Sequence, residues 1–255
     1  MKNIVTLILC LGLLLANKAS AQNKQFVTAG VIEYEKTCNM FALLKKKLVA
    51  PFYNDNKPHY DNYLRKEPQF LKLKSTLTFG NNTSLFTPVP QYVYVMYDQP
   101  IVSQPNIVFN DFKTGTFTLQ KEFNEKTLLV KDTLRKIVWK ITDETRVIAG
   151  YNCRRANGLV LDSMYAVAFY AEDIHVPGGP ESFTGLPGMI MLVALPHDNV
   201  SWQATKVTVA PPDEKKLIPP KKGTPVDYKG MHQQLFRGLG QAGELGRYYL
   251  KGYTL

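Results

Sequence analysis

The stretch Phe183-Thr-Gly-Leu-Pro-Gly-Met-Ile190 places two glycines and a proline directly before an apolar run. Pro187 presets φ at the second position of a type II β-turn, and Gly188 suits the positive φ that the third position requires. The four residues Gly185, Leu186, Pro187 and Gly188, the GLPG segment, are therefore predicted to form a tight structural turn. The apolar residues 189–195 that follow are typical of a buried strand.

Strand signals dominate the rest of the chain. Short β-branched or aromatic runs are separated by turn residues such as Gly80-Asn81-Asn82, Lys113-Thr114-Gly115 and Asn157-Gly158. Residues 137–141 alternate, with Ile137, Trp139 and Ile141 on one face, as in a sheet with one buried side. The predicted strands are residues 27–37, 75–79, 91–97, 115–123, 128–131, 135–142, 146–154, 164–171, 189–195 and 201–209.

Helix signals are confined to the flanks of this pattern. Residues 39–49 carry one amphipathic stripe, made of Met40, Leu43, Leu44 and Leu48. Residues 227–236 are a second candidate helix, and the glycines that follow argue against its extension, so residues 227–255 are predicted to be a helical or irregular tail. Residues 211–226, rich in proline and lysine, are predicted to be an exposed connector that contains no strand.

No linker or internal repeat divides residues 22–255, so we expect a single domain. The dense strand pattern with flanking helices predicts a mainly β fold. It would be a curved, mostly antiparallel sheet, similar to a half-barrel, with one or two helices against it. The strand rhythm resembles that of the half-barrel of periplasmic lipoprotein carriers. A two-sheet β-sandwich is the alternative.

Residues 1–21 have the features of a secretory signal peptide. Lys2 precedes an apolar core that is too short to span a bilayer, and Ala19-Ser20-Ala21 offers a cleavage pattern. We therefore expect an exported chain, cleaved after Ala21, that resides in the periplasm, at the outer membrane or outside the cell, with no transmembrane segment in its mature part. The formal net charge is +10, but the basic residues are scattered and no nucleic-acid-binding motif is present, so no nucleic-acid partner is predicted.

Export also determines how the cysteines are interpreted. Cys38 and Cys153 would mature in a compartment where disulfides form. A bridge between them would close a long loop and stabilise the fold by up to about 4–5 kcal/mol in the chain-entropy model. Two buried free thiols are the alternative, because the sequence does not place the two Cα atoms within disulfide reach.

Several segments of the chain follow the order that is usual in one family of secreted Bacteroidetes proteins. They are Lys136–Arg146, Ile148–Ala156, Ala168–Ile174, Gly179-Pro180 and the GLPG segment, with Thr76–Phe86 as an earlier match. The chain thus resembles the GLPGLI family, with Met189 where the family name has leucine. The family has no established activity and no defined site residues. Its members are often encoded beside TonB-dependent outer-membrane receptors, and the resemblance therefore implies such a receptor as a partner.

The sequence contains no G-x-S-x-G, H-E-x-x-H or C-x-x-C motif, and its four histidines sit in no triad-like pattern. We therefore predict a protein that is not an enzyme and has no cofactor. Weak candidates for a metal site follow two neighbouring strands: Glu172, Asp173 and His175 after one, and His197 and Asp198 after the next. The two sets would share one sheet edge if the GLPG segment folds the strands back, and imidazole plus carboxylate suits a divalent ion. Solvated polar residues at strand ends are the alternative.

Two tripeptides, Asp132-Thr133-Leu134 and Asp162-Ser163-Met164, resemble the D-[S/T]-apolar O-glycosylation pattern of exported Bacteroidetes proteins. Thr133 and Ser163 are therefore candidate attachment sites, although so short a pattern also arises readily by chance.

The main functional hypothesis is an exported, non-enzymatic cell-envelope protein that binds a ligand or partner as an accessory to TonB-dependent uptake. The first alternative is a periplasmic carrier that holds a lipid or another small apolar or peptide ligand in the mouth of the curved sheet. A metal-dependent enzyme is the second alternative.

Overall fold

The structure is a computed structural model. It describes residues 26–47, 53–92, 95, 100–103, 105–123, 125–161, 163–212, 215–239 and 243–255. The predicted signal peptide, residues 1–21, lies outside the described residues.

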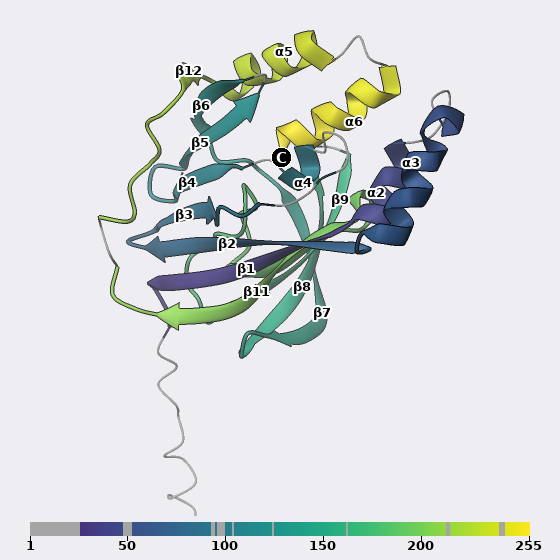
Figure 1. The fold of residues 1–255 in the computed structure, drawn as a ribbon. Coiled ribbons are helices and arrows are strands. Elements are labelled where there is room, and N and C mark those ends of the chain that lie inside the picture. The colour runs from purple at the N-terminus through teal and green to yellow at the C-terminus, as the bar shows by residue number, and fades with distance from the viewer. Residues whose placement is uncertain are drawn as a thin grey trace, which may run out of the picture.

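Twelve strands form one open sheet in the order β12-β6-β5-β4-β3-β2-β1-β11-β10-β9-β8-β7. Every neighbouring pair is antiparallel except β12 with β6. The strands are β1 (Gly30–Asn39), β2 (Phe70–Gly80), β3 (Thr83–Pro88), β4 (Ile107–Asp111), β5 (Thr116–Phe123), β6 (Lys126–Thr133), β7 (Val138–Ile148), β8 (Tyr151–Val160), β9 (Met164–Ala171), β10 (Met189–Leu195), β11 (Val200–Val209) and β12 (Thr224–Val226). The predicted fold class, one curved and mostly antiparallel sheet, is confirmed (Figure 1).

The core lies on the inner face of the curve because alternate residues of the strands point there. In β1, for example, Ile32, Tyr34, Lys36 and Cys38 are buried, while the residues that alternate with them are more exposed. The helices gather along the upper and right-hand side of the sheet in Figure 1. They are α2 (Met40–Lys47), α3 (Tyr53–Lys66), α4 (Pro100–Ser103), α5 (Tyr228–Leu239) and α6 (Gly243–Thr254). No helix in the described part of the chain is long and apolar enough to cross a membrane.

The first predicted helix is confirmed as α2. The Asn39 side chain caps it by accepting a hydrogen bond from the Ala42 N–H at 3.2 Å, and Met40, Leu43 and Leu44 are buried as the stripe predicts. Helix α3 was not predicted from the sequence. It is polar, with a mid-helix proline, Pro58, that normally indicates a helix end.

Two errors in the strand prediction concern the position of turns around β8. The predicted strand 146–154 is broken by a hairpin turn at Ala149 and Gly150, whose φ angles are +48° and +85°. Asn157-Gly158, predicted as a turn, lies instead within β8, where Gly158 pairs with Trp139. A Cβ on Gly158 would lie 2.8 Å from the Trp139 ring, so glycine is required there by packing.

Two other segments differ from the prediction in the middle of the chain. Gln91, Tyr92 and Val95 are not in a strand, and the rest of the predicted strand 91–97 lies outside the described residues. Strand β4 was missed, because residues 107–111 alternate over only five positions. The turns at Gly80-Asn81-Asn82 and before Gly115 are confirmed, with φ of +53°, +59° and +68° at residues 81, 82 and 115.

The C-terminal quarter of the chain is more regular than predicted. Residues 211–226 were expected to contain no strand, but Thr224–Val226 form β12, which pairs in parallel with residues 128–130 in the middle of β6. A proline is tolerated there because β12 is an edge strand. Helix α5 is confirmed, with the Gly230 N–H donating to Asp227 Oδ1 at 2.7 Å. Residues 243–254 form a further helix, α6, so this part of the predicted helical or irregular tail is helical.

Candidate functional site

The connection between β9 and β10, residues 172–188, is buried although it is rich in glycine and proline. Ile174, Val176, Phe183 and Leu186 are each at most 2% exposed and belong to the core. We call residues 172–188 the β9–β10 connection. Its apolar side chains draw the backbone inside the curve of the sheet, because each contributes roughly 1.5–3 kcal/mol when it leaves water.

Hydrogen bonds from distant elements hold this connection. Trp139 Nε1 in β7 donates to the Thr184 carbonyl at 2.9 Å. The hydroxyl of Ser182 donates to the carbonyl of the C-terminal residue, Leu255, at 3.1 Å. On the other side, Asn106 Nδ2 donates to Glu181 Oε2 at 2.9 Å. The connection is thus fixed to the edge of the sheet, to the C-terminus and to the start of β4.

The GLPG segment does not form the predicted type II turn. The φ of Gly188 lies outside the positive range, and the positive φ, +93°, belongs to Gly185. The Gly188 N–H donates to the Leu186 carbonyl at 2.8 Å, which is the hydrogen bond of a γ-turn centred on Pro187. Glycine is required at 188 for a different reason, since a Cβ there would lie 2.2 Å from the Ala171 carbonyl oxygen.

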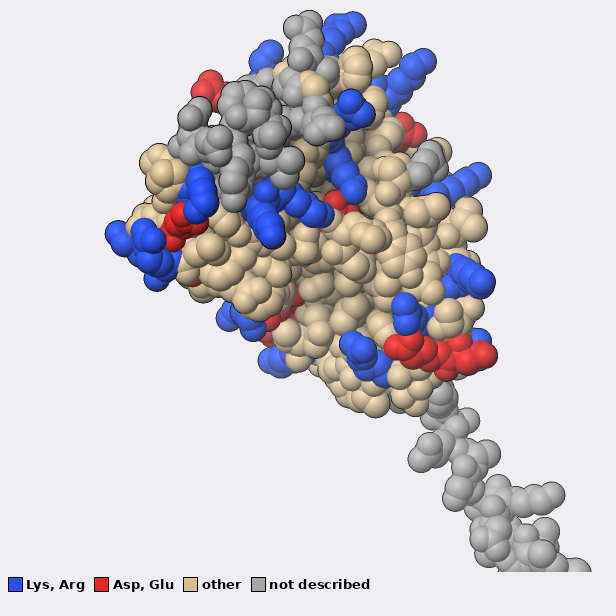
Figure 2. All heavy atoms as spheres, turned by 90° about the vertical axis from the view of Figure 1, so that its right-hand side faces the viewer, with Lys and Arg blue, Asp and Glu red and all other residues tan. Residues whose placement is uncertain are grey.

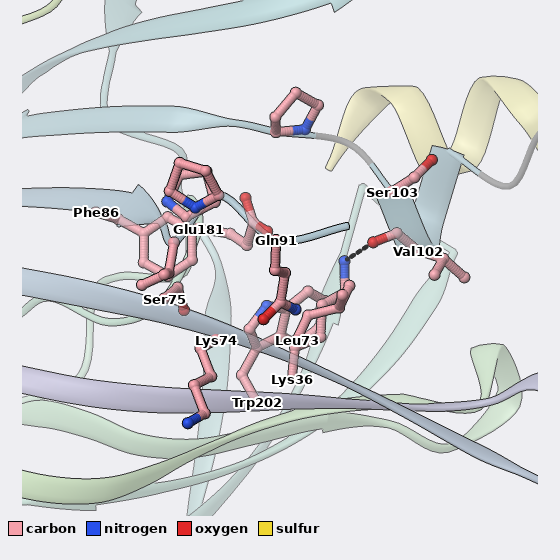
Figure 3. A pocket seen from close by; sticks show the side chains of 14 residues that line it. Lys36, Leu73, Lys74, Ser75, Phe86, Gln91, Val102, Ser103, Glu181 and Trp202 are labelled. Carbon is pink, nitrogen blue, oxygen red and sulfur yellow. Dashed lines mark hydrogen bonds between the residues drawn. The ribbon is translucent and has the colours of Figure 1, made fainter. Parts of the chain in front are cut away.

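A cavity of about 240 Å³ lies between the inner face of the sheet, helix α4 and the β9–β10 connection (Figure 3). Most of its wall is apolar, and the apolar lining residues include Leu73, Phe86, Pro88, Val102 and Trp202. Three buried polar side chains, Lys36, Ser75 and Glu181, also line it, together with the less buried Lys74, Gln91 and Ser103. An apolar pocket with a few convergent polar groups is the usual form of a small-molecule site.

The strand register explains how Lys36 comes to this wall. Lys36 in β1 pairs with Leu73 in β2 on one side and with Trp202 in β11 on the other. All three side chains therefore stand in one row on the inner face. Lys36 Nζ donates to the Val102 carbonyl at 3.0 Å and lies 4.8 Å from the centroid of the Trp202 ring. Figure 3 shows this ammonium group directed toward α4 across the cavity.

A second buried lysine, Lys121 in β5, lies near the same wall. It is fully buried, and its Nζ has no hydrogen-bond partner among the described residues. Burial lowers the pKa of Lys121 to about 7; Glu181 opposes this shift, whereas the nearby cations Arg135 and Lys36 add to it. The group of buried charges therefore contains more cations than carboxylates.

Glu181 has two unusual features in addition to its burial. Its φ is +51°, in the left-handed region that residues other than glycine, asparagine and aspartate rarely adopt. Its carboxylate is held by Asn106, whose own Oδ1 has no partner in the described part of the structure. Backbone strain at a buried charged residue costs of order 1–3 kcal/mol and occurs most often at functional sites. Glu181 is thus the residue of the β9–β10 connection that most resembles part of a site.

The two cysteines are both buried free thiols. They lie on β1 and β8, with three strands between them in the sheet. Burial raises the pKa of Cys153 to about 12 and also raises the pKa of Cys38. Of the two interpretations that the sequence left open, the structure has the unbridged one, and both thiols are in the inert, protonated form at neutral pH.

The structure separates the weak metal candidates. Because β9 and β10 are antiparallel, with Ala171 opposite Met189 and Val167 opposite Ala194, the residues after β9 and those after β10 lie at opposite ends of the pair. The expectation of a shared sheet edge is therefore wrong. Tyr170 donates to Glu172 at 3.1 Å, and Lys251 pairs with Asp198 at 2.7 Å. No group of three or more such side chains in the described ranges could hold a metal ion.

The remaining metal candidates have separate contacts of their own, and the two glycosylation candidates lie elsewhere on the surface. The ring of His175 stacks on Phe26, the backbone carbonyl of His197 accepts from Lys46, and Asp173 accepts from the Val27 N–H through its own carbonyl. Thr133 and Ser163, the two glycosylation candidates, are both exposed at strand ends. Asp162 lies outside the described residues. Whether either hydroxyl carries a glycan stays a prediction.

Sequence reasoning missed Lys36, Lys121 and Glu181. The first two could have been found, because each is a charged residue at an inward position of an alternating strand. Lys121 lies between the buried Leu119 and Phe123, as Lys36 lies between Tyr34 and Cys38. Nothing in the sequence marks Glu181.

On the surface, lysines and arginines are spread in separate groups over the face shown in Figure 2, in keeping with the scatter of basic residues along the sequence.

Comparisons with known proteins identify no family. No protein-family model matches the chain, and no curated protein matches it. Two solved structures of PNGF-II, in different space groups, resemble part of it. One has 17% identity and a TM-score of 0.49 over 80% of this chain and 33% of that chain. The other has 16% identity and a TM-score of 0.48 over 78% and 31%. This chain therefore spans about a third of their length, and the GLPGLI resemblance stays a prediction.

Proposed function

We propose that this protein is an exported, non-enzymatic binding protein that holds a small, largely apolar ligand in the cavity on the inner face of its sheet. The observation that carries the proposal is the cavity wall itself. It combines apolar side chains with Lys36 and with Glu181, a buried carboxylate held in a strained backbone conformation. A fold that needed only a packed core would be more stable with apolar residues at these positions.

The orphaned polar atoms support the same proposal. Ser75 Oγ and Trp202 Nε1 belong to side chains of the cavity wall, are buried, and have no hydrogen-bond partner within the described residues. A buried polar group without a partner costs about 1–3 kcal/mol. A bound ligand that accepts hydrogen bonds would offset this cost after a small adjustment of the wall.

The site of action is part of the proposal. The signal-peptide pattern of residues 1–21 supports export, and the GLPGLI resemblance supports an accessory role beside a TonB-dependent outer-membrane receptor. The protein would then hold its ligand at the cell envelope and present it to, or receive it from, that receptor.

Native mass spectrometry of the protein purified from the periplasm of its own host tests the proposal. We expect the mass of a chain that starts at Gln22 together with the mass of one bound small molecule, and we expect this molecule to be lost on acid denaturation. A cavity-filling variant, Leu73→Trp, should fold with an unchanged far-UV circular dichroism spectrum and carry no adduct. A wild-type protein that carries no adduct, and whose melting temperature no small apolar compound raises, would contradict the binding function.

A further inference from the structure

We infer that the ligand of this cavity is a small carboxylic acid with an apolar body, whose carboxylate binds to Lys36. The inference rests on the proposed binding function and names the chemical class of its ligand. It depends on the bonding capacity of Lys36, on the balance of buried charge and on the composition of the remaining wall.

Lys36 has bonding capacity that the protein does not use. The side chain is 6% exposed, and its ammonium group donates to the Val102 carbonyl and lies over the Trp202 ring. An ammonium group has three N–H donors. Among the residues that the structure describes, Lys36 forms no ion pair, so a charge that is almost completely removed from water lacks a counter-ion. A carboxylate in the cavity would supply both the counter-charge and the missing acceptor.

The balance of charge around the cavity also favours an anion. Glu181 is the one carboxylate among the described residues of the wall. It already accepts a hydrogen bond from Asn106, and it is the carboxylate that acts on the buried Lys121. One negative charge therefore stands against the positive charge of Lys36 and, below a pH of about 7, that of Lys121 as well. A cationic ligand would increase this imbalance, whereas an anionic ligand would reduce it.

The rest of the wall indicates the size and the nature of the ligand body. Ser75 and Trp202 each hold an unused donor near Lys36, which suits a carboxylate because it accepts several hydrogen bonds. Lys74, Gln91 and Ser103 also line the cavity, and the remaining side chains of the wall are apolar. A volume of about 240 Å³ is roughly eight times the share of one water molecule and smaller than a pocket for a drug-sized molecule. A short acyl or aryl chain fits this description.

Isothermal titration calorimetry with three probes of equal chain length tests the inference. Octanoate, octanol and octylamine are titrated into the mature protein near neutral pH. We expect octanoate to bind at least about tenfold more tightly than octanol, a difference of about 1.4 kcal/mol, and octylamine to bind most weakly. Equal affinities for octanoate and octanol would overturn the carboxylate inference but leave the binding function intact. Failure of all three probes to bind would overturn both.

Variants of Lys36 test its assignment. Lys36→Met should retain octanol binding and lose the preference for octanoate, whereas Lys36→Arg should keep the preference. Lys206→Met removes one charge from the exposed face of β11 and serves as the matched control, with the wild-type preference. Melting temperatures of the variants show that each is folded. A Lys36→Met protein that is folded and still prefers octanoate tenfold would overturn the role of Lys36.

Discussion

Two proline-rich connections of this chain have opposite environments. The β9–β10 connection lies inside the curve of the sheet, whereas the described residues 210–212 and 215–223, between β11 and β12, pass the strand ends at the left of Figure 1. The buried connection carries Ile174, Val176 and Phe183 between its glycines and prolines; the exposed one carries lysines. Glycine and proline therefore mark where regular structure ends, and the residues between them decide whether the segment is buried.

The largest effect is expected from removal of an apolar anchor. Phe183 is 1% exposed and packs against Trp202, with ring centroids 5.7 Å apart. Phe183→Ala should lower the free energy of unfolding by about 3–5 kcal/mol. Ile218→Ala, in the exposed connection, should change it by less than about 0.5 kcal/mol, because Ile218 is 47% exposed. Urea denaturation measures both, and equal losses would show that the two connections do not differ as described.

A smaller loss is expected at Gly188. Any side chain there brings a Cβ within 2.2 Å of the Ala171 carbonyl oxygen, so Gly188→Ala and Gly188→Asn should both destabilise the protein by about 1–3 kcal/mol. Gly185→Asn should be tolerated better, because asparagine adopts positive φ and nothing lies closer than 3.8 Å to the new Cβ. If asparagine at 188 restored most of the stability that alanine loses, residue 188 would adopt positive φ after all.

The sequence predicted the fold class and the central strands because hydrophobic patterning there is unambiguous. Strands β9 and β10 begin and end at the predicted residues, 164–171 and 189–195. They are buried on both faces, so their apolar runs leave no other interpretation. The Asn157-Gly158 turn was predicted wrongly because the packing of Trp139 on Gly158, a contact between strands, overrides a local turn preference.

The candidate site could be predicted less well than the fold, because it also depends on contacts between segments that are distant in the sequence. The type II turn predicted for the GLPG segment is absent, because the approach of Gly188 to β9 depends on the path of the whole connection. The wall that joins Lys36, Ser75 and Glu181 brings together residues more than one hundred positions apart. No local sequence pattern indicates that these three residues lie close together in space. An inward lysine in an alternating strand is the one signal that the sequence offers.

The smallest effect concerns the charge that faces the buried connection. Burial lowers the pKa of Lys121 to about 7, whereas a lysine in an unfolded chain titrates near 10.4. Between these values the unfolded state binds a proton that the native state does not. The free energy of unfolding should therefore rise with pH above about 7, by at most about 1.4 kcal/mol per pH unit. Below pH 7 both states are protonated and the contribution of Lys121 is constant.

Urea denaturation at several pH values between about 7 and 8.5 isolates this contribution when the wild type is compared with Lys121→Met, because the titration of the other groups cancels in the difference. The wild-type protein should gain about 1.6 kcal/mol relative to Lys121→Met over the interval. The matched variant Lys221→Met, in the exposed connection, should follow the wild-type profile, because Lys221 stays in water. Parallel profiles for the wild type and Lys121→Met would mean that Lys121 keeps its proton when buried. An internal counter-charge stronger than Glu181 alone would then be required on the inner face of the sheet.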